Sequence, residues 1–542
     1  MKRIVAILLV LVLALSVACT AKPENNGKST PNTNNETKNN SETSKEESKT
    51  DVSTAEIQPV KGGRLKISAA TPTTRAWYDI RGIMAVAMFG MIYEPLARYG
   101  SDGAPEPFLA ESITPDAEAL TWTIVLRDGI KFSDGSDCDA DAVAWNLDFY
   151  KANGVLTASF FKYYDHAEVK DAKTVVCHFT QWDALFDYSL CRTVLIASKK
   201  AFDEHGQDWL CENPVGTGPF VQAEFNADTS WYLDRNENYW QGEVYLDGLD
   251  LITYQQELVA ATSLNAGEID ALLTENYSMV EQMKGYQDIT SKAADLPSYY
   301  YTLCFNMKEG DPFANEKVRE AVSHAIDVDS IIDTLCFGYA IKTNQWAPES
   351  SPFYNKDVAG QVYDVEKAKA LLAEAGYPNG FDTMITCGSA TLAVNVCQII
   401  VEQLSKIGIN VELRSIEGAA FVNYIGGWEQ GMFLHQMGAE AGAASQYAST
   451  FYQYEGFGLG VNAFVIPDEL HAVTTSITSA KTSDERNTKT QEVAKMVVDD
   501  YCMIKVIFGS QAVAFVSDKV QNHHFCDVQN LRFDVWQAWL AK

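Results

Sequence analysis

The sequence predicts an α/β fold that is divided into more than one domain. In the C-terminal half, helix patterns alternate with strand patterns, which is the order typical of α/β domains. With 542 residues the chain is longer than one hydrophobic core serves, so two or three domains are expected. Hydrophobic residues make up 46% and charged residues 21% of the sequence, which is ordinary for a globular protein and excludes disorder of the whole chain.

The folded body begins with short strands and one apolar helix. Leu65–Ser68, which follows Gly62 and Gly63, predicts the first strand, and the run Ile83–Ile92 predicts a helix. Apolar and polar residues then alternate across residues 109–132, which indicates two strands. A helix is expected to follow over Ala140–Tyr150.

The segment Asn213–Phe220 contains two glycines and two prolines. Glycine adopts backbone angles that other residues resist, and proline cannot donate a hydrogen bond to a neighbouring strand. Gly216, Gly218, Pro214 and Pro219 therefore predict a tight, exposed turn at the edge of a sheet. Two alternating strands are expected around the polar residues 226–229, as a hairpin.

The C-terminal half combines strands with capped helices. Ser298–Asn306 is rich in aromatic residues and predicts a strand. Asn315 and Asp364 each precede a run in which apolar residues recur at spacings of three and four, so each is expected to cap a helix. The remaining expected elements are a helix over Val394–Ile407, a strand over Ile409–Leu413, a helix over Asp484–Asp500 and a strand over Met503–Phe508.

Charge and cysteine content restrict the classes of partner. The formal net charge of −30 repels nucleic acid and anionic membrane surfaces, so no nucleic-acid partner is expected. Ten cysteines follow Cys19, without the dense spacing of a disulfide scaffold. We expect most of them to be small buried hydrophobic residues, and the sequence leaves open which of them pair.

Two groups of residues resemble metal ligands without completing a site. Asp137, Asp139, Asp141 and Asp148 match positions of a calcium loop, but Ala142 stands where glycine is required. A turn in which Asp139 caps the next helix is therefore expected. The cluster His523, His524 and Cys526 lies in a short polar turn. No metal or cofactor is predicted, and no HExxH, P-loop or GxSxG motif indicates an enzyme.

The first residues form an export signal. Lys2 and Arg3 precede the apolar run Ile4–Leu15, which is too short to span a bilayer. The following Ser-Val-Ala-Cys ends at Cys19 and resembles a bacterial lipobox, so lipidation of Cys19 is expected; the alternative is an ordinary cleaved signal. Residues 20–58 contain no aromatic residue and are expected to form a disordered tether.

Several motifs resemble the extracellular solute-binding proteins of ABC transporters, family 5, whose members collect peptides, nickel complexes and some sugars. They occur in the family's order over about residues 62–542, and are Asn213–Phe220, Arg235–Trp240, Leu264–Asp270, Val318–Asp327, Tyr363–Tyr377 and Gln403–Glu412. The resemblance implies a two-lobed periplasmic-binding-protein-like fold (type II, large cluster) with an extra small domain. It assigns residues 62–96, 183–303 and 506–542 to lobe I, 97–182 to the inserted domain and 304–505 to lobe II. Tyr299–Phe305 and Cys502–Phe508 would be the two crossings between the lobes.

The same resemblance implies a function and a set of site residues. The protein would be a monomeric receptor on the outer face of the bacterial cytoplasmic membrane that captures a peptide and delivers it to an ABC permease. Glu440 falls where family peptide binders hold the ligand's amino group with an aspartate. Trp77, Trp346 and Trp428 are aromatic candidates for the pocket. A metal chelate or an oligosaccharide as the ligand, and a surface-anchored hydrolase, remain alternatives.

Overall fold

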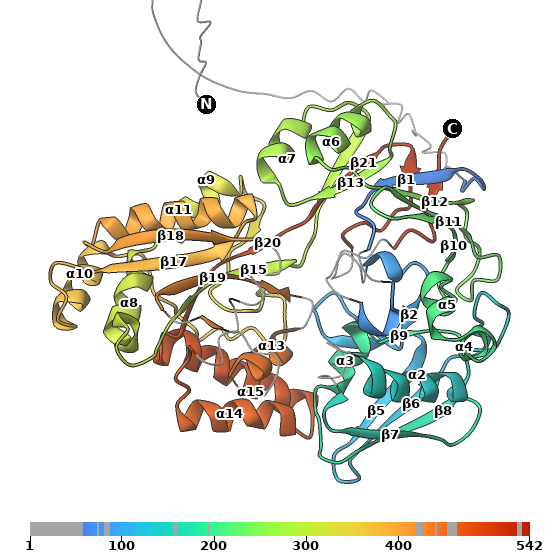
Figure 1. The fold of residues 1–542 in the computed structure, drawn as a ribbon, viewed down its shortest axis with the longest axis horizontal. Coiled ribbons are helices and arrows are strands. Elements are labelled where there is room, and N and C mark those ends of the chain that lie inside the picture. The colour runs from blue at the N-terminus through green and yellow to red at the C-terminus, as the bar shows by residue number, and fades with distance from the viewer. Residues whose placement is uncertain are drawn as a thin grey trace, which may run out of the picture. The chain divides into compact units, whose positions relative to one another are not determined.

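A computed structural model describes residues 58–72, 75–80, 87–154, 161–192, 194–417, 420, 424, 427–428, 430–439, 442–451, 463–527 and 534–542. Gln58–Lys542 form one compact unit. This unit contains two large β-sheets, a sheet of four strands and the helices that cover them (Figure 1). Across the described ranges, none of the helices combines the length and the apolar character that crossing a bilayer requires.

The first large sheet is organised around β1 (Arg64–Ser68), which confirms the first predicted strand. β1 runs parallel to β12 (Gly248–Ile252) on one side and to β13 (Ala271–Thr274) on the other. The strand order is β10-β11-β12-β1-β13-β21-β14. The other members are β10 (Phe220–Asn226), β11 (Ser230–Arg235), β21 (Val513–Ser517) and β14 (Ile289–Ala293), with helices α6 (Glu257–Asn265) and α7 (Tyr277–Met283) in the same region.

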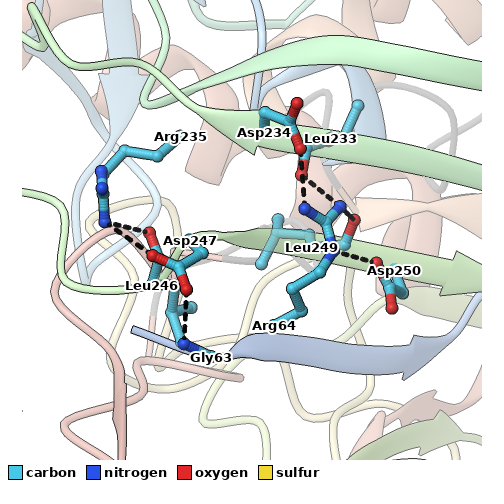
Figure 2. A network of polar contacts seen from close by, with 9 residues as sticks. All are labelled: Gly63, Arg64, Leu233, Asp234, Arg235, Leu246, Asp247, Leu249 and Asp250. Carbon is cyan, nitrogen blue, oxygen red and sulfur yellow. Dashed lines mark hydrogen bonds and ion pairs between the residues drawn. The ribbon is translucent and has the colours of Figure 1, made fainter. Parts of the chain in front are cut away.

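A polar network around Arg64 ties this central strand to its neighbours (Figure 2). The guanidinium donates to Asp250 at 2.6 Å and to Asp234 at 2.7 Å. It also donates to the carbonyl groups of Leu233 and Leu249, at 2.8 and 3.2 Å. Because the planar fork of arginine serves several acceptors at once, one side chain links β1 to both β11 and β12.

The second large sheet has the order β16-β20-β15-β19-β17-β18. Alternate side chains of β15 (Tyr299–Phe305) enter two different cores. Leu303 packs in the cluster that includes Val318 and Ile400, whereas Tyr300 belongs to the cluster that includes Tyr447 and Val493. The other strands are β16 (Ala340–Ile341), β20 (Ile504–Ser510), β19 (Met432–Gly438), β17 (Asp382–Gly388) and β18 (Asn410–Ile416).

The helices of this half follow the predicted capping pattern. The side chain of Asn315 accepts from Lys317 N at the start of α8, and that of Asp364 accepts from Lys367 N at the start of α10. Both predicted caps are therefore confirmed. The helices are α8 (Glu316–Ala325), α9 (Val328–Leu335), α10 (Val365–Glu374), α11 (Thr391–Ser405), α13 (Gly442–Phe451), α14 (Asp468–Ser479) and α15 (Ser483–Lys495), which continues as a π-helix over Met496–Asp500.

A four-stranded sheet with the order β5-β6-β8-β7 carries the helix α2 (Ala140–Asn153). The side chain of Asp139 accepts from Ala142 N, which confirms it as the helix cap, and Asp148 accepts from the Tyr164 hydroxyl at 2.6 Å. The remaining elements of the N-terminal half are β2 (Glu94–Pro95), β3 (Ala97–Tyr99), β4 (Pro105–Pro107), β5 (Ala110–Asp116), β6 (Thr121–Leu126), β7 (Tyr164–Val169), β8 (Thr174–Phe179), α3 (Phe186–Arg192), β9 (Leu195–Ile196), α4 (Lys199–His205) and α5 (Gln207–Glu212).

The predicted exposed turn around Gly216 and Gly218 is wrong. This segment does lead into the edge strand β10, but both glycines are buried, and neither has a positive φ. The reason for glycine is close packing. A Cβ on Gly218 would lie 2.6 Å from the carbonyl oxygen of Met91, and one on Gly216 would overlap the carbonyl oxygen of Ile92.

The carboxylate of Glu94 joins two of the sequence motifs, Asn213–Phe220 and Arg235–Trp240. Glu94 is 2% exposed, and it accepts from the Thr217 hydroxyl at 2.8 Å. It also accepts from the Tyr239 hydroxyl and from Trp240 Nε1, each at 2.7 Å. Since a buried carboxylate needs donors, the spacing of Thr217, Tyr239 and Trp240 in the sequence reflects one shared acceptor.

The chain passes between the two large sheets twice. The first passage leads from β14 to β15 over residues 294–298, and the second leads from β20 to β21 over residues 511–512. β15 and β20 themselves belong entirely to the second sheet, so the crossings lie beside the expected segments Tyr299–Phe305 and Cys502–Phe508 rather than within them. Figure 1 shows β15 and β20 next to each other where they approach β13 and β21.

Candidate functional site

The two passages are bonded to each other, which makes this region a candidate hinge. Ser298 N donates to the carbonyl of Ser510 at 2.8 Å, and Ala294 N donates to the carbonyl of Ala512 at 2.8 Å. Glu275, just after β13, makes side-chain hydrogen bonds with Ser298 and Ser510. Burial raises the pKa of the Glu275 carboxyl, while these two hydrogen bonds act in the opposite direction. One carboxyl group therefore contacts both the first passage and the last residue of β20, where the second passage begins.

Trp346 lies on one face of the second sheet, next to β15. Its indole Nε1 donates to the Thr302 hydroxyl at 2.9 Å, and its backbone N donates to the Tyr447 hydroxyl at 3.2 Å. Its ring stacks on Tyr447 and Phe451, with centroids 4.7 and 5.9 Å away. Trp346 is 1% exposed, so its role in this structure is to join β15 to α13.

Trp428 belongs to the same aromatic group. Its Nε1 donates to the Gln430 carbonyl at 2.9 Å, and its ring lies 6.3 Å from that of Phe464. Phe464 lies 5.4 Å from Phe451, which also contacts Trp346. The structure thus places Trp346 and Trp428 at two ends of one aromatic group, although they are 82 positions apart (428 − 346).

Trp77 is separate from this group. It is fully buried in the N-terminal half and its ring contacts those of Tyr78, Trp145, Phe149 and Phe202. The structure therefore does not bring the three predicted tryptophans together. Contact of any of them with a ligand stays a prediction.

Glu440 and Cys19 lie outside the described residues, as do residues 1–57, which contain the expected signal and nearly all of the tether. The nearest described residues on the two sides of Glu440 are Ala439 and Gly442. Ala439 N donates to the carbonyl of Ser298 at 2.9 Å, in the first passage, and Gly442 packs against the ring of Tyr188. Ala439 therefore contacts the first passage, and Gly442 contacts a residue of the N-terminal half.

His435 is a polar candidate that the sequence did not reveal. It lies directly opposite Thr302 in the β15–β19 register, so it is on the same face of the sheet as the Trp346 contact. Its ring stacks on Phe433 at 5.6 Å, and its Nδ1 has no hydrogen-bond partner among the residues that the structure places. Burial lowers the pKa of His435 to about 3, so the ring is neutral at pH 7.

The neutral imidazole can donate one hydrogen bond and accept another, but it brings no charge. Phe433, His435 and Met437 alternate along one face of the strand, and this period of two was the available sequence signal. Finding His435 also required the pairing with Thr302, which the sequence does not show.

A small cavity in the N-terminal half lies apart from this face. Its lining includes Glu94, Arg98, Tyr239 and Trp536, and its volume is about 50 Å³. Ligand pockets for small organic molecules typically measure about 300–1,000 Å³. This cavity is thus too small for a peptide.

A family model for "Bacterial extracellular solute-binding proteins, family 5 Middle" matches residues 104–458. The glutathione-binding protein GsiB of Salmonella paratyphi A is 30% identical over 393 residues, which cover 70% of this chain and 75% of GsiB.

Solved structures extend the likeness to nearly the whole described unit. DppA of Helicobacter pylori, in complex with the peptide STSA, is 25% identical with a TM-score of 0.73, and the match covers 89% of this chain and 99% of DppA. NikA of Brucella suis, in complex with Fe(III)-EDTA, is 20% identical with a TM-score of 0.78, covering 88% of this chain and all of NikA. At that identity the NikA likeness concerns the fold alone.

Proposed function

The chain belongs to the bacterial extracellular solute-binding proteins of family 5, and from that membership we propose that it captures peptides between two lobes and delivers them to the permease of an ABC importer. The observation that carries this proposal is the family match over residues 104–458 together with the similarity to DppA, which was solved with a bound peptide. A metal chelate is the second candidate ligand, because NikA shares the fold and holds Fe(III)-EDTA.

The proposed lobes are residues 62–96, 183–303 and 506–542 for lobe I and 304–505 for lobe II, with 97–182 as a small inserted domain. Two covalent passages that are bonded to each other form a single axis, about which two such bodies can close on a solute. Closure removes water from the ligand, so its charged ends must meet charges or backbone groups of the protein. We assign Glu440 to the ligand's amino group, with Trp346, Trp428 and Trp77 as further candidates. No chemical reaction is part of this role.

We further propose that Cys19 carries a lipid and holds a monomeric receptor on the outer face of the cytoplasmic membrane. Two or more acyl chains anchor a protein far better than one. Mass spectrometry of the membrane-extracted protein should find a lipid on Cys19 in the wild type and none in Cys19→Ala. A wild-type N-terminus without lipid would overturn the anchor and favour an ordinary cleaved signal.

The ligand class is tested by native mass spectrometry of the purified protein, followed by calorimetry. A bound peptide, and stoichiometric binding of that peptide without turnover, would support the proposal. A bound chelate or oligosaccharide would replace the peptide, and turnover of the ligand would favour a surface hydrolase. A ligand present at about one hundred times its Kd should add roughly 2.7 kcal/mol to the free energy of unfolding.

A further inference from the structure

A second connection joins the two halves of the unit, and it involves neither passage. It is formed by residues 182–188 of the N-terminal half and residues 478–486 of the C-terminal half. Trp182 Nε1 donates to the carbonyl of Ala480 at 2.7 Å, and Ala184 N donates to the carbonyl of Thr478 at 2.8 Å. In Figure 1 the start of α15 lies beside the segment that leads into α3.

A buried ion pair lies at the centre of this connection. Nη1 of Arg486 is 3.0 Å from both carboxylate oxygens of Asp187 and 2.6 Å from the carbonyl of Ala184. The side chains of Arg486 and Asp187 are 6% and 13% exposed. The guanidinium also lies over the ring of Tyr188, at 4.8 Å from its centroid.

Tyr188 extends the contact into the second half. A Cβ on Gly442, which has a φ of +68°, would lie 2.6 Å from the Tyr188 ring, so only glycine permits this approach. The ring of Phe353 lies 6.0 Å away from that of Tyr188. One tyrosine of α3 is therefore enclosed by three separate segments of the other half, at Phe353, Gly442 and Arg486.

Two physical properties of this connection favour its opening: the low net stability of its buried ion pair, and polar groups that have no partner among the described residues while it is closed. Burying a charged pair costs hydration free energy that largely offsets its attraction, so returning the pair to water is inexpensive compared with exposing an apolar core. In addition, Arg486 Nε and the Tyr188 hydroxyl have no hydrogen-bond partner among the described residues. Water reaching them on opening would satisfy both groups.

We propose that the Asp187–Arg486 ion pair is a latch that holds the two lobes closed and sets how long a captured solute stays bound. This inference rests on the proposed function, because a latch has a use only if the lobes close on a solute. The hinge guides the motion, whereas the latch joins the lobes through segments that the hinge does not contain. Loss of the latch should therefore speed solute release more than it slows capture, as is usual for changes in contacts made after encounter.

The test compares Arg486→Gln with Lys489→Gln, a control that removes a cation from the same helix. Lys489 forms an ion pair with Glu492 within α15 and does not belong to the connection. Small-angle scattering of the full chain without ligand should show a larger radius of gyration for Arg486→Gln only. Stopped-flow release of the co-purified solute should be on the order of tenfold faster, with the association rate changed less than threefold.

Asp187→Asn provides a second variant if Arg486→Gln fails to fold, and the exchange Asp187→Arg with Arg486→Asp should restore part of the compactness. A folded variant with unchanged radius and unchanged release rate would overturn the latch and make the ion pair part of a permanently joined interior. If the protein binds no solute at all, the proposed function fails, while scattering of the unliganded variants still decides whether the pair holds the halves together.

Discussion

The hydroxyl of Tyr277 donates a hydrogen bond to the backbone carbonyl of Gln511 at 3.1 Å and accepts one from its backbone amide at 2.9 Å. Gln511 lies in the second passage between the sheets, and its side chain donates to the carbonyl of Ala294 in the first passage at 2.6 Å. Tyr277, at the start of α7, therefore forms hydrogen bonds with both the backbone amide and the backbone carbonyl of Gln511. Without this side chain, both groups would need water as their partner. A side chain that lies beside the first sheet therefore fixes the path of the chain through the candidate hinge.

Replacing Tyr277 with Phe should lower the free energy of unfolding by about 2 kcal/mol, because both backbone groups of Gln511 lose their partner while the ring remains. Urea denaturation measures the difference. Tyr245→Phe, at a half-buried site, is the control and should change stability by less than ~0.5 kcal/mol. Equal losses for the two variants would show that the Tyr277 hydroxyl contributes nothing specific.

Gly216→Ala should lower the free energy of unfolding by about 3 kcal/mol, because the added methyl group overlaps the carbonyl oxygen of Ile92 inside a packed core. Gly285→Ala is the matched control. No atom lies within 4 Å of a Cβ at Gly285, and its φ is not positive. That control should be neutral or stabilise by up to about 1 kcal/mol. A tolerated alanine at residue 216 would contradict the close-packing explanation, and thermal melting of both variants decides it.

The helix caps and Gly216 show which structural features could be predicted from the sequence and which could not. The helix caps at Asn315 and Asp364 were predictable because a cap depends on residues two or three positions away. The role of Gly216 was not, since its neighbour Ile92 is distant in the chain and the same residue type also serves exposed turns. The strand over Ser298–Asn306 was predicted by its aromatic content, but the sheet to which it belongs depends on pairing partners that local patterns do not specify.

The candidate site shows the same division. The tryptophans could be selected as aromatic candidates, but only the fold shows that Trp346 and Trp428 share one group and that Trp77 belongs to another. His435 was overlooked because its neutrality and its position opposite Thr302 arise from burial and from strand register. Both are tertiary properties.

Lys505→Met should stabilise the protein by about 2 kcal/mol at pH 7. Lys505 is 7% exposed on β20, and burial lowers its pKa to about 8, although its Nζ donates to the carbonyl of Gln361 at 2.6 Å. The unfolded chain therefore holds the proton more tightly than the folded protein does. Below pH 8 the folded state carries a costly buried charge, which methionine removes.

The lowered pKa of Lys505 determines how the stability difference between the wild type and Lys505→Met changes with pH. Between pH 8 and the ordinary lysine pKa of about 10.4, the unfolded state binds more protons than the folded state, so the stability of the wild type rises with pH relative to the variant. Denaturant unfolding at pH 7 and pH 10 should show the advantage of Lys505→Met shrinking. An advantage that is constant across this range, or a wild type that is more stable at pH 7, would contradict the assignment.

The last prediction concerns Glu440, which we propose takes the role of the amine-binding aspartate of family peptide binders. In a closed cleft the ligand's ammonium group is poorly solvated, and removing one partner of such a buried pair costs about 2–5 kcal/mol. Glu440→Gln keeps the shape of the side chain and removes its charge. The affinity for peptides with a free amino group should therefore fall by well over tenfold, as measured by calorimetry.

N-acetylated peptides separate a specific contact from general damage to the fold. They lack the ammonium group, so they should bind weakly to the wild type and lose little more in Glu440→Gln. Equal losses for both kinds of peptide would mean that Glu440 acts on the fold. No loss for either would place Glu440 outside the binding site or show that the ligand is not a peptide, in which case a metal chelate such as the one held by NikA becomes the next ligand to titrate. Ala439 contacts Ser298 in the first passage, and Gly442 contacts Tyr188, which is next to the latch residue Asp187. A ligand contact at Glu440 would therefore link occupancy of the site to closure of the lobes.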